Sequence, residues 1–292
     1  MMMGTWVLGA ILATQAPAAT EQVRAFVATV TADKGGAVTG LDANDVAILE
    51  NGVARDLVSI DADDRPVTLA LVIDTSEAAQ SALRLNIAEA AGRFLKGLPE
   101  GSTFALWSTG DRPTKILDYT SNQVEAQKAL ARLFPRGGNT LLDAVAESAA
   151  DLNKQGEKRE KREGGERSVV VALTGLNPEL SNRDKWRAVE EAQKKAGLFM
   201  AVSYDEGGAD FEDRQKYDYL LSTLSRDSGG RYETVLSPMA TSAAMDKLLD
   251  DLKSQYRVKY VTAPALKDKD RRLEVKIARP GVKVRIGRSK IS

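Results

Sequence analysis

The feature that most constrains the fold is a continuous apolar run, Val67–Ile73, which ends at Asp74. A strand that is apolar at every position is typical of a parallel sheet buried on both faces. Further apolar runs alternate with segments of helical spacing, and this alternation predicts an α/β fold, with a mostly parallel central sheet flanked by helices. The expected helices cover 77–98, 123–133, 141–152, 184–196, 214–226 and 241–254, and the other strands 103–107, 115–119, 168–174, 198–204 and 231–235.

Strand patterns of a different kind lie on both sides of this region. They cover 23–31, 45–49 and 53–60 before it, and 257–260, 273–277 and 282–286 after it. The pair Asn51-Gly52 between two of them is a strong hairpin signal. Because isolated hairpins are marginal in water, we expect the strands of the two ends to pair in one sheet.

The chain is therefore expected to contain a small β module, built from 20–65 and 253–292, into which an α/β domain of residues 66–252 is inserted. The charges agree with this division. Residues 20–65 carry 4 basic and 9 acidic residues, whereas 253–292 carry 13 basic and 3 acidic residues. Opposite charges favour pairing of the two segments, although exposed ion pairs add little stability.

The N-terminus predicts export. Residues 1–20 carry no charged side chain, and an apolar stretch over 6–13 is followed by Ala16-Pro17-Ala18-Ala19. This pattern is typical of a signal peptide covering 1–19 and indicates a periplasmic or secreted protein. A disordered start is the alternative. The chain has no run of 18 apolar residues, so no transmembrane segment is expected.

Two residue types are absent, and their absence excludes much chemistry. The chain has no cysteine and no histidine among its 292 residues. It therefore has no disulfide, no thiolate or imidazole metal ligand, no Ser-His-Asp triad and no imidazole base. Any metal ion must be held by oxygen atoms.

Three loops at the expected ends of strands carry oxygen-bearing side chains. They cover 74–78, 137–144 and 173–181. Because the carboxyl ends of parallel strands meet at one edge of a sheet, an aspartate and several hydroxyls converge there. Such groups are oxygen ligands for Mg²⁺.

With these loops, the chain resembles the von Willebrand factor type A (VWA) domain, and specifically the bacterial VWFA-related proteins. The resemblance extends to the hairpin with Glu50-Asn51-Gly52 and to the strand over 255–260. It implies a Rossmann-like fold, a non-enzymatic role in binding a protein ligand, and a metal-ion-dependent adhesion site (MIDAS). In the family, this site is an Asp-x-Ser-x-Ser loop, a threonine in a second loop and an aspartate in a third.

Carried over by position, Asp74, Ser76 and Thr140 match the metal ligands of the family. Ala78 stands in place of the second serine, and Gly175 in place of the aspartate. The resemblance therefore implies a degenerate site that holds no cofactor, or Mg²⁺ only weakly, since Mg²⁺ is usually bound through one or two carboxylates and waters.

Other carboxylates could compensate for the missing ligands, and Glu77, Asp143 and Glu179 are the candidates. The competing interpretation is that the matching residues cap helices. Asp74 or Ser76 would cap a helix that begins near Glu77, and Thr140 with Asp143 would form a capping-box-like pair. We expect capping to be their present role.

Two other functions remain as alternatives. A phosphatase of the haloacid dehalogenase type would use Asp74, but it requires an acid two residues later, where Ser76 stands. A basic face on the C-terminal strands could bind an anionic envelope polymer. This face would consist of Arg257, Lys259, Lys276, Lys283 and Arg285.

No nucleic-acid partner is expected. The charged run over 153–167 interleaves six basic residues with four acidic ones, and such a mixture is typical of a solvated helix or loop. The sequence therefore predicts a non-enzymatic, extracytoplasmic, adhesion-type protein-interaction module with a VWA-like fold.

Overall fold

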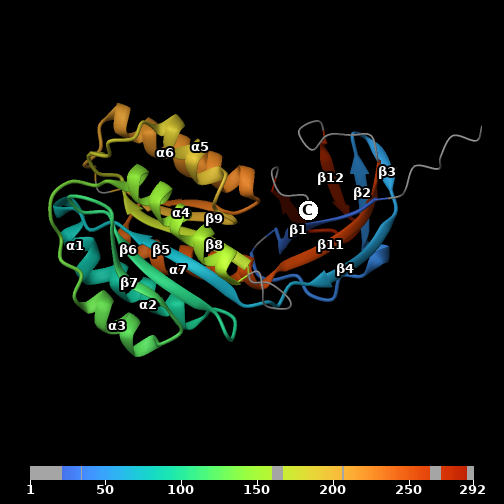
Figure 1. Cartoon of the computed structure of the whole chain (residues 1–292), viewed down its shortest axis with the longest axis horizontal. Helices are drawn as coiled ribbons and strands as arrows, with labels where there is room; N and C mark the ends of the chain where they lie inside the picture. Colours follow the sequence, from blue (N-terminus) through green and yellow to red (C-terminus); the bar gives the residue numbers. More distant parts are fainter. Residues whose placement is uncertain (1–21, 34, 160–166, 206, 264–270, 288–292) are drawn as a thin grey trace, which may run out of the picture.

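The structure, a computed structural model, describes residues 22–33, 35–159, 167–205, 207–263 and 271–287 (Figure 1). An α/β domain lies beside two small antiparallel sheets, which are built from strands of both ends of the chain. The predicted fold class is confirmed. The expected signal peptide, 1–19, lies outside the described residues.

The central sheet has the strand order β10-β9-β8-β5-β6-β7, and only β7 runs antiparallel to its neighbour. Its strands are β5 (Val67–Ile73), β6 (Thr103–Ser108), β7 (Thr114–Thr120), β8 (Arg167–Gly175), β9 (Leu198–Tyr204) and β10 (Tyr232–Val235). Ile73, the last residue of β5, is in register with Ser108 on one side and Leu173 on the other. This register brings the loops after β5, β6 and β8 to one edge.

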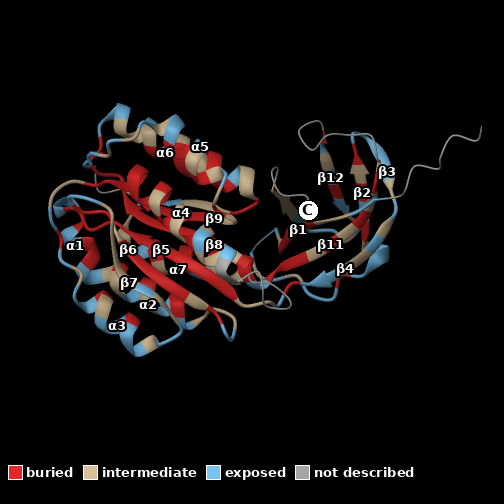
Figure 2. Ribbon diagram, viewed as in Figure 1, coloured by how far each residue is buried: buried red, intermediate tan, exposed pale blue. Residues whose placement is uncertain are grey.

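Helices cover both faces of the sheet. They are α1 (Gln80–Ala82), α2 (Ala88–Lys96), α3 (Gln123–Ala131), α4 (Leu141–Arg159), α5 (Lys185–Gln193), α6 (Phe211–Ser228) and α7 (Thr241–Lys253). Leu69 and Leu71 of β5 pack in a core with α2, α3 and α7, whereas Ala70 and Val72 pack in a second core with α4, α5 and α6. Burial on both faces (Figure 2) explains why β5 is apolar at every position except Thr68, which is also buried.

The helix expected over 77–98 is interrupted. A 3₁₀ turn (Glu77–Ala79) precedes α1, and a π-helical segment (Leu83–Ile87) separates α1 from α2. π-helical segments are rare and often lie at functional sites. Apolar spacing alone did not reveal this change of hydrogen bonding, because Leu83 and Ile87 are buried as a regular helix would also bury them.

The strands of the two ends form two sheets. One has the order β13-β1-β11-β4 and the other β12-β2-β3. Their bounds are β1 (Gln22–Ala32), β2 (Val46–Glu50), β3 (Val53–Arg55), β4 (Leu57–Ala62), β11 (Gln255–Thr262), β12 (Leu273–Ile277) and β13 (Val282–Ile286). Both sheets contribute to one core that includes Phe26, Val30, Ile48, Val258 and Tyr260. The expectation of a single sheet was therefore wrong, whereas the expected pairing between the two ends is present.

The strand expected over 53–60 is also corrected. β3 returns beside β2 after the Asn51-Gly52 turn, but β4 crosses to the other sheet and pairs with β11. The chain passes from one sheet to the other at Asp56, which belongs to neither β3 nor β4. The carbonyl of Asp56 accepts a hydrogen bond from the backbone N–H of Val261. The partner strand lies some two hundred residues away in sequence, so a local pattern could not predict the division.

Among the described residues, the structure contains no helix that is both long enough and apolar enough to cross a membrane.

Candidate functional site

Asp74 lies at the end of β5 and is fully buried, with 0% of its surface exposed. Its carboxylate accepts four hydrogen bonds from neutral N–H groups. The donors are the Ser76 backbone to Oδ1 (2.9 Å), and the Gly175 backbone (3.0 Å), Asn177 Nδ2 (3.1 Å) and Asn139 Nδ2 (3.3 Å) to Oδ2. The loops after β5 and β8 and the loop before α4 thus meet at this carboxylate.

The charge of Asp74 is not neutralised by any hydrogen-bonded cation in the described part of the chain. Burial raises the pKa of Asp74, because a charged carboxylate is disfavoured away from water, and the N–H donors oppose this rise only in part. A buried carboxylate in such surroundings is a costly feature of a fold.

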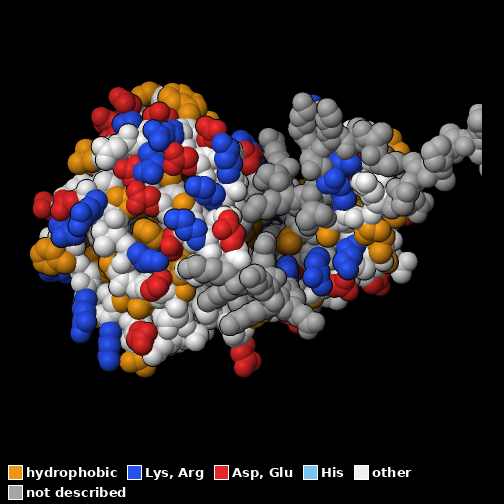
Figure 3. All heavy atoms as spheres, in the orientation of Figure 1, with side chains coloured by type: hydrophobic (Ala, Val, Ile, Leu, Met, Phe, Trp, Pro, Cys, Tyr) orange, Lys and Arg blue, Asp and Glu red, His pale blue; other side chains and the backbone are white. Residues whose placement is uncertain are grey.

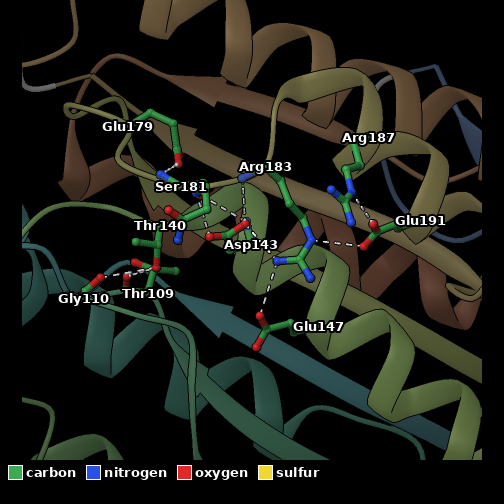
Figure 4. A network of polar contacts seen from close by, with 11 residues as sticks. Thr109, Gly110, Thr140, Asp143, Glu147, Glu179, Ser181, Arg183, Arg187 and Glu191 are labelled. Atoms are coloured by element: carbon green, nitrogen blue, oxygen red, sulfur yellow. Dashed lines mark hydrogen bonds and ion pairs between the residues drawn. The ribbon is translucent and has the colours of Figure 1, made fainter.

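Ser76 and Thr140 do not act as the expected caps. The hydroxyl of Ser76 is buried beside Asp74, where it helps to lower the pKa of that carboxyl, and it makes no capping bond to the helical turn that follows. The hydroxyl of Thr140 instead donates to the carbonyls of Thr109 and Gly110 (Figure 4). Thr140 therefore ties the loop after β6 to the start of α4.

Asp143 stabilises the loop that follows β8 and is not part of a capping box with Thr140. Its carboxylate accepts hydrogen bonds from the backbone of Asn182 (2.9 Å) and Arg183 (3.1 Å), and from the Arg183 guanidinium (2.9 Å). Arg183 also contacts Glu147 and Glu191, so the loop is held against α4 and α5 (Figure 4).

The space at Gly175 is filled by neighbouring side chains. A Cβ atom at this position would lie 2.5 Å from Nδ2 of Asn177 and 3.0 Å from Cε2 of Tyr204. Both distances are too short for an ordinary contact between heavy atoms. An aspartate at 175 therefore requires Asn177 and Tyr204 to move.

Asn139, Asn177 and Tyr217 are site residues that sequence reasoning missed. The amide of Asn139 lies 2.9 Å from both the Thr174 hydroxyl and the Tyr217 hydroxyl, and Tyr217 donates to the carbonyl of Asn177 (2.9 Å). The two asparagines stand inside the predicted site loops over 137–144 and 173–181, and this position was the available signal. Tyr217 comes from the middle of α6 and gave no local signal.

Three carboxylates had been considered as replacement ligands. Glu77 is exposed, and Asp143 is engaged by Arg183. Glu179 is buried, and burial raises its pKa to about 7, although its Oε1 accepts a hydrogen bond from the Ser181 backbone (2.9 Å). No group of three or more acidic residues in the described ranges is arranged to hold a metal ion.

The expected basic face is only partly formed. The ladders between β1, β11 and β13 place Arg257, Lys259, Lys283 and Arg285 on one face of their sheet, but Lys276 belongs to the other sheet. Arg285 forms an ion pair with the buried Asp251, and Lys283 lies 3.7 Å from Asp33.

Residues 69–177 match the family model described as the von Willebrand factor type A domain. The chain contains a VWA domain. The matched segment runs from β5 to the loop after β8, so it includes Asp74, Thr140 and Gly175. No curated protein matches the sequence.

Solved structures share the fold at low sequence identity. A von Willebrand factor type A structure from Catenulispora acidiphila is 11% identical, with a TM-score of 0.54, over 91% of this chain and 73% of that one. Proximal thread matrix protein 1 from the mussel byssus is 16% identical, with a TM-score of 0.50, over 70% of this chain and 50% of that one. A second structure of the mussel protein, with a zinc-occupied MIDAS motif, is 15% identical, with a TM-score of 0.48, over 71% and 50% of the two chains. The chain thus spans about half the length of the mussel protein. At these identities, the similarity shows the fold alone.

Proposed function

We propose that this protein is a non-enzymatic, extracytoplasmic protein-interaction module whose MIDAS is degenerate. The observation that carries the proposal is the set of four N–H donors on Asp74. Donors of this kind stabilise an anion, whereas Mg²⁺ requires oxygen ligands with free lone pairs.

The residues present do not fit the metal ion that the VWA fold implies. The Oδ2 atom of Asp74 already accepts three hydrogen bonds, from Gly175, Asn177 and Asn139, and Asn177 would have to withdraw before this oxygen could bind a metal ion. Gly175 cannot be replaced by the missing aspartate without displacing Asn177 and Tyr204. The site therefore works without a metal ion.

A partner would instead be held by apolar contacts on the loops around the site. Leu180 follows β8, Phe211 begins α6 after β9, and Leu236 and Met239 follow β10, and these side chains are between 61% and 90% exposed. Exposed apolar groups concentrated on one edge are typical of a protein-binding surface.

The same geometry argues against catalysis by Asp74. A phosphatase requires a carboxylate that a substrate can reach, but Asp74 is fully buried, and both of its oxygen atoms accept hydrogen bonds. The sequence offers no histidine or cysteine as a substitute nucleophile or base.

Calorimetric titration of the protein with Mg²⁺ and Mn²⁺ tests the degenerate site. We expect no binding below millimolar concentrations, and we expect the triple variant Ala78→Ser, Gly175→Asp, Asn177→Ala to gain affinity for Mn²⁺. A micromolar Kd of the unaltered protein that Asp74→Ala abolishes would overturn the proposal.

The extracytoplasmic location rests on the pattern of residues 1–19. N-terminal sequencing of the protein recovered from outside the cytoplasm checks it, and the expected first residue is Ala19 or Thr20. An intact Met1 on that protein would contradict cleavage.

A further inference from the structure

A pocket of about 440 Å³ lies on the flank of the VWA domain, between α3 and β7. The loops over 108–112 and 134–136 complete its walls. Its volume is within the range of sites that hold small ligands or a few side chains of a partner. None of its lining residues forms a hydrogen bond with the carboxylate of Asp74.

The rim of the pocket is strongly basic. Arg112, Lys128, Arg132 and Arg136 line it, against a single acid, Glu125. Arg136 lies 3.6 Å from Asp111, whereas the other three bases form no ion pair with any residue that the structure describes. Basic side chains project around α3 at the lower left of Figure 3.

One wall of the pocket is apolar. Ile116 and Leu117 come from β7, Ala129 and Leu133 from α3 and its end, and Phe134 from the loop that follows. Phe134 is 72% exposed, although it stands beside a hollow that could bury it. An exposed aromatic ring at the mouth of a pocket is a feature typical of a binding site.

An ordinary structural role accounts for only part of this arrangement. Lys128 stands in the last turn of α3 and Arg132 is its C-cap residue, and positive charge there stabilises the C-terminal end of the helix dipole. Arg112 and Arg136 come from two loops outside α3, and the dipole does not explain them. Nor does it explain the exposure of Phe134.

We infer that this pocket binds an acidic peptide segment of a partner protein. Carboxylates of the segment pair with the basic rim, and a neighbouring leucine or phenylalanine of the segment packs against the apolar wall and Phe134. Charge complementarity selects an anion, and the apolar wall favours a peptide over a simple inorganic anion, which would leave that wall exposed. The peptide nature of the ligand rests on the proposed interaction role, but not on the state of the metal site.

The pocket also reaches the loop that carries Asp74. Thr75 lines the pocket, and its hydroxyl accepts a hydrogen bond from the backbone of Gly110 (3.0 Å). A bound segment would therefore come close to the loop that carries Asp74.

Fluorescence anisotropy with a labelled, capped peptide that alternates glutamate with leucine and phenylalanine tests the inference. We expect saturable binding that weakens about tenfold in the variant Lys128→Gln, Arg132→Gln, since two charge-assisted contacts are lost. Phe134→Ser should weaken binding by a similar factor. The matched control is Arg84→Gln, which removes an exposed arginine outside the pocket and should leave the affinity unchanged.

The altered side chains are exposed, so these variants are expected to fold, and far-ultraviolet circular dichroism checks this. A second readout is Phe134→Trp, whose emission should change when the peptide is added. The inference is overturned if the peptide does not bind, if a peptide with serine in place of leucine and phenylalanine binds equally well, or if inorganic phosphate competes as strongly as the peptide. Failure of the peptide together with absent Mg²⁺ binding would leave the degenerate-site proposal intact.

Discussion

Two fully buried carboxylates, Asp74 in the VWA domain and Glu50 in the β sheets, show opposite shifts of pKa. Burial alone raises the pKa of each. At Glu50, hydrogen bonds from the Thr262 hydroxyl (2.6 Å), the Ala263 backbone (3.0 Å) and Arg271 (2.5 Å) outweigh burial and lower the pKa to about 2. At Asp74, the donors are all neutral, and the pKa remains raised.

The hydrogen bonds that Glu50 accepts from the Thr262 hydroxyl, the Ala263 backbone and Arg271 together outweigh the effect of burial on its pKa, whereas those that Asp74 accepts do not. Glu50 joins β2 to the end of β11 through Tyr260 and Thr262, so it acts as a structural connection between the two sheets. Asp74 has comparable burial without a neutralising cation. The N–H groups of Ser76, Gly175, Asn177 and Asn139 surround it instead.

Removing Arg271, the buried cation that pairs with Glu50, is expected to have the largest effect on stability. Arg271→Met leaves a buried charge with only Arg55 as its basic partner, and the free energy of unfolding should fall by about 3 to 5 kcal/mol. Urea unfolding measures this loss. Arg272→Met, at the exposed neighbouring position, is the control and should change stability little. A loss below about 1 kcal/mol would show that the hydroxyl and backbone donors suffice.

The stability contributed by the region around Asp74 should depend on pH in the opposite sense to the stability contributed by Glu50. Glu179 has an ordinary pKa of 4.5, which burial raises to about 7. The folded state therefore binds its proton more tightly than the unfolded state. The protein should lose up to about 3 kcal/mol of stability as the pH rises from 4.5 through 7, and Glu179→Gln should remove this loss.

Urea unfolding at about pH 5 and about pH 8 compares the variant with the unaltered protein. Glu77→Gln, which changes an exposed glutamate on a neighbouring loop, serves as the control and should keep the pH dependence. Parallel pH curves for the unaltered protein and Glu179→Gln would contradict the assignment.

The smallest expected effect concerns the space that a cation-binding aspartate would need. Gly175→Ala forces a Cβ atom against Asn177 and Tyr204, and it should destabilise the protein by about 1 to 3 kcal/mol. Adding Asn177→Ala should recover part of this loss in a double-mutant cycle. Gly156→Ala is the control, because only the Ser168 hydroxyl lies near, at 3.9 Å, and alanine favours a helix. If Gly175→Ala raised the free energy of unfolding as much as Gly156→Ala does, the space at position 175 would be open to a side chain.

The sequence predicted best the strands whose own apolar pattern indicates which of their faces are buried. The bounds of β5, β9, β12 and β13 were as expected, because their apolar patterns reflect the surfaces on which they pack. β3 and β4 were merged, since the break at Asp56 depends on pairing with β11. The π-helical segment, Leu83–Ile87, has the same apolar spacing as a regular helix and was missed.

The candidate site was located but not understood from the sequence. Asp74 lies at the meeting point of the three predicted loops, whereas the hydroxyl of Thr140 contacts backbone carbonyls. Asn177 and Tyr217 were missed because neutral side chains carry no pattern that reveals which oxygen they will contact. The resemblance to VWA domains implied that Ala78 and Gly175 stand in place of two metal ligands. The crowding at Gly175 required coordinates.

The pairing of β1 with β13 also determines how the molecule carries a mechanical load. Ala28 is paired with Ile286, and Ala32 with Val282, so strands from the two ends of the described chain are directly bonded to each other. Tension applied between Gln22 and Ile286 passes through these ladder bonds, and the VWA domain lies outside that path. The VWA domain can therefore keep its shape while the β sheets bear a pull along the chain.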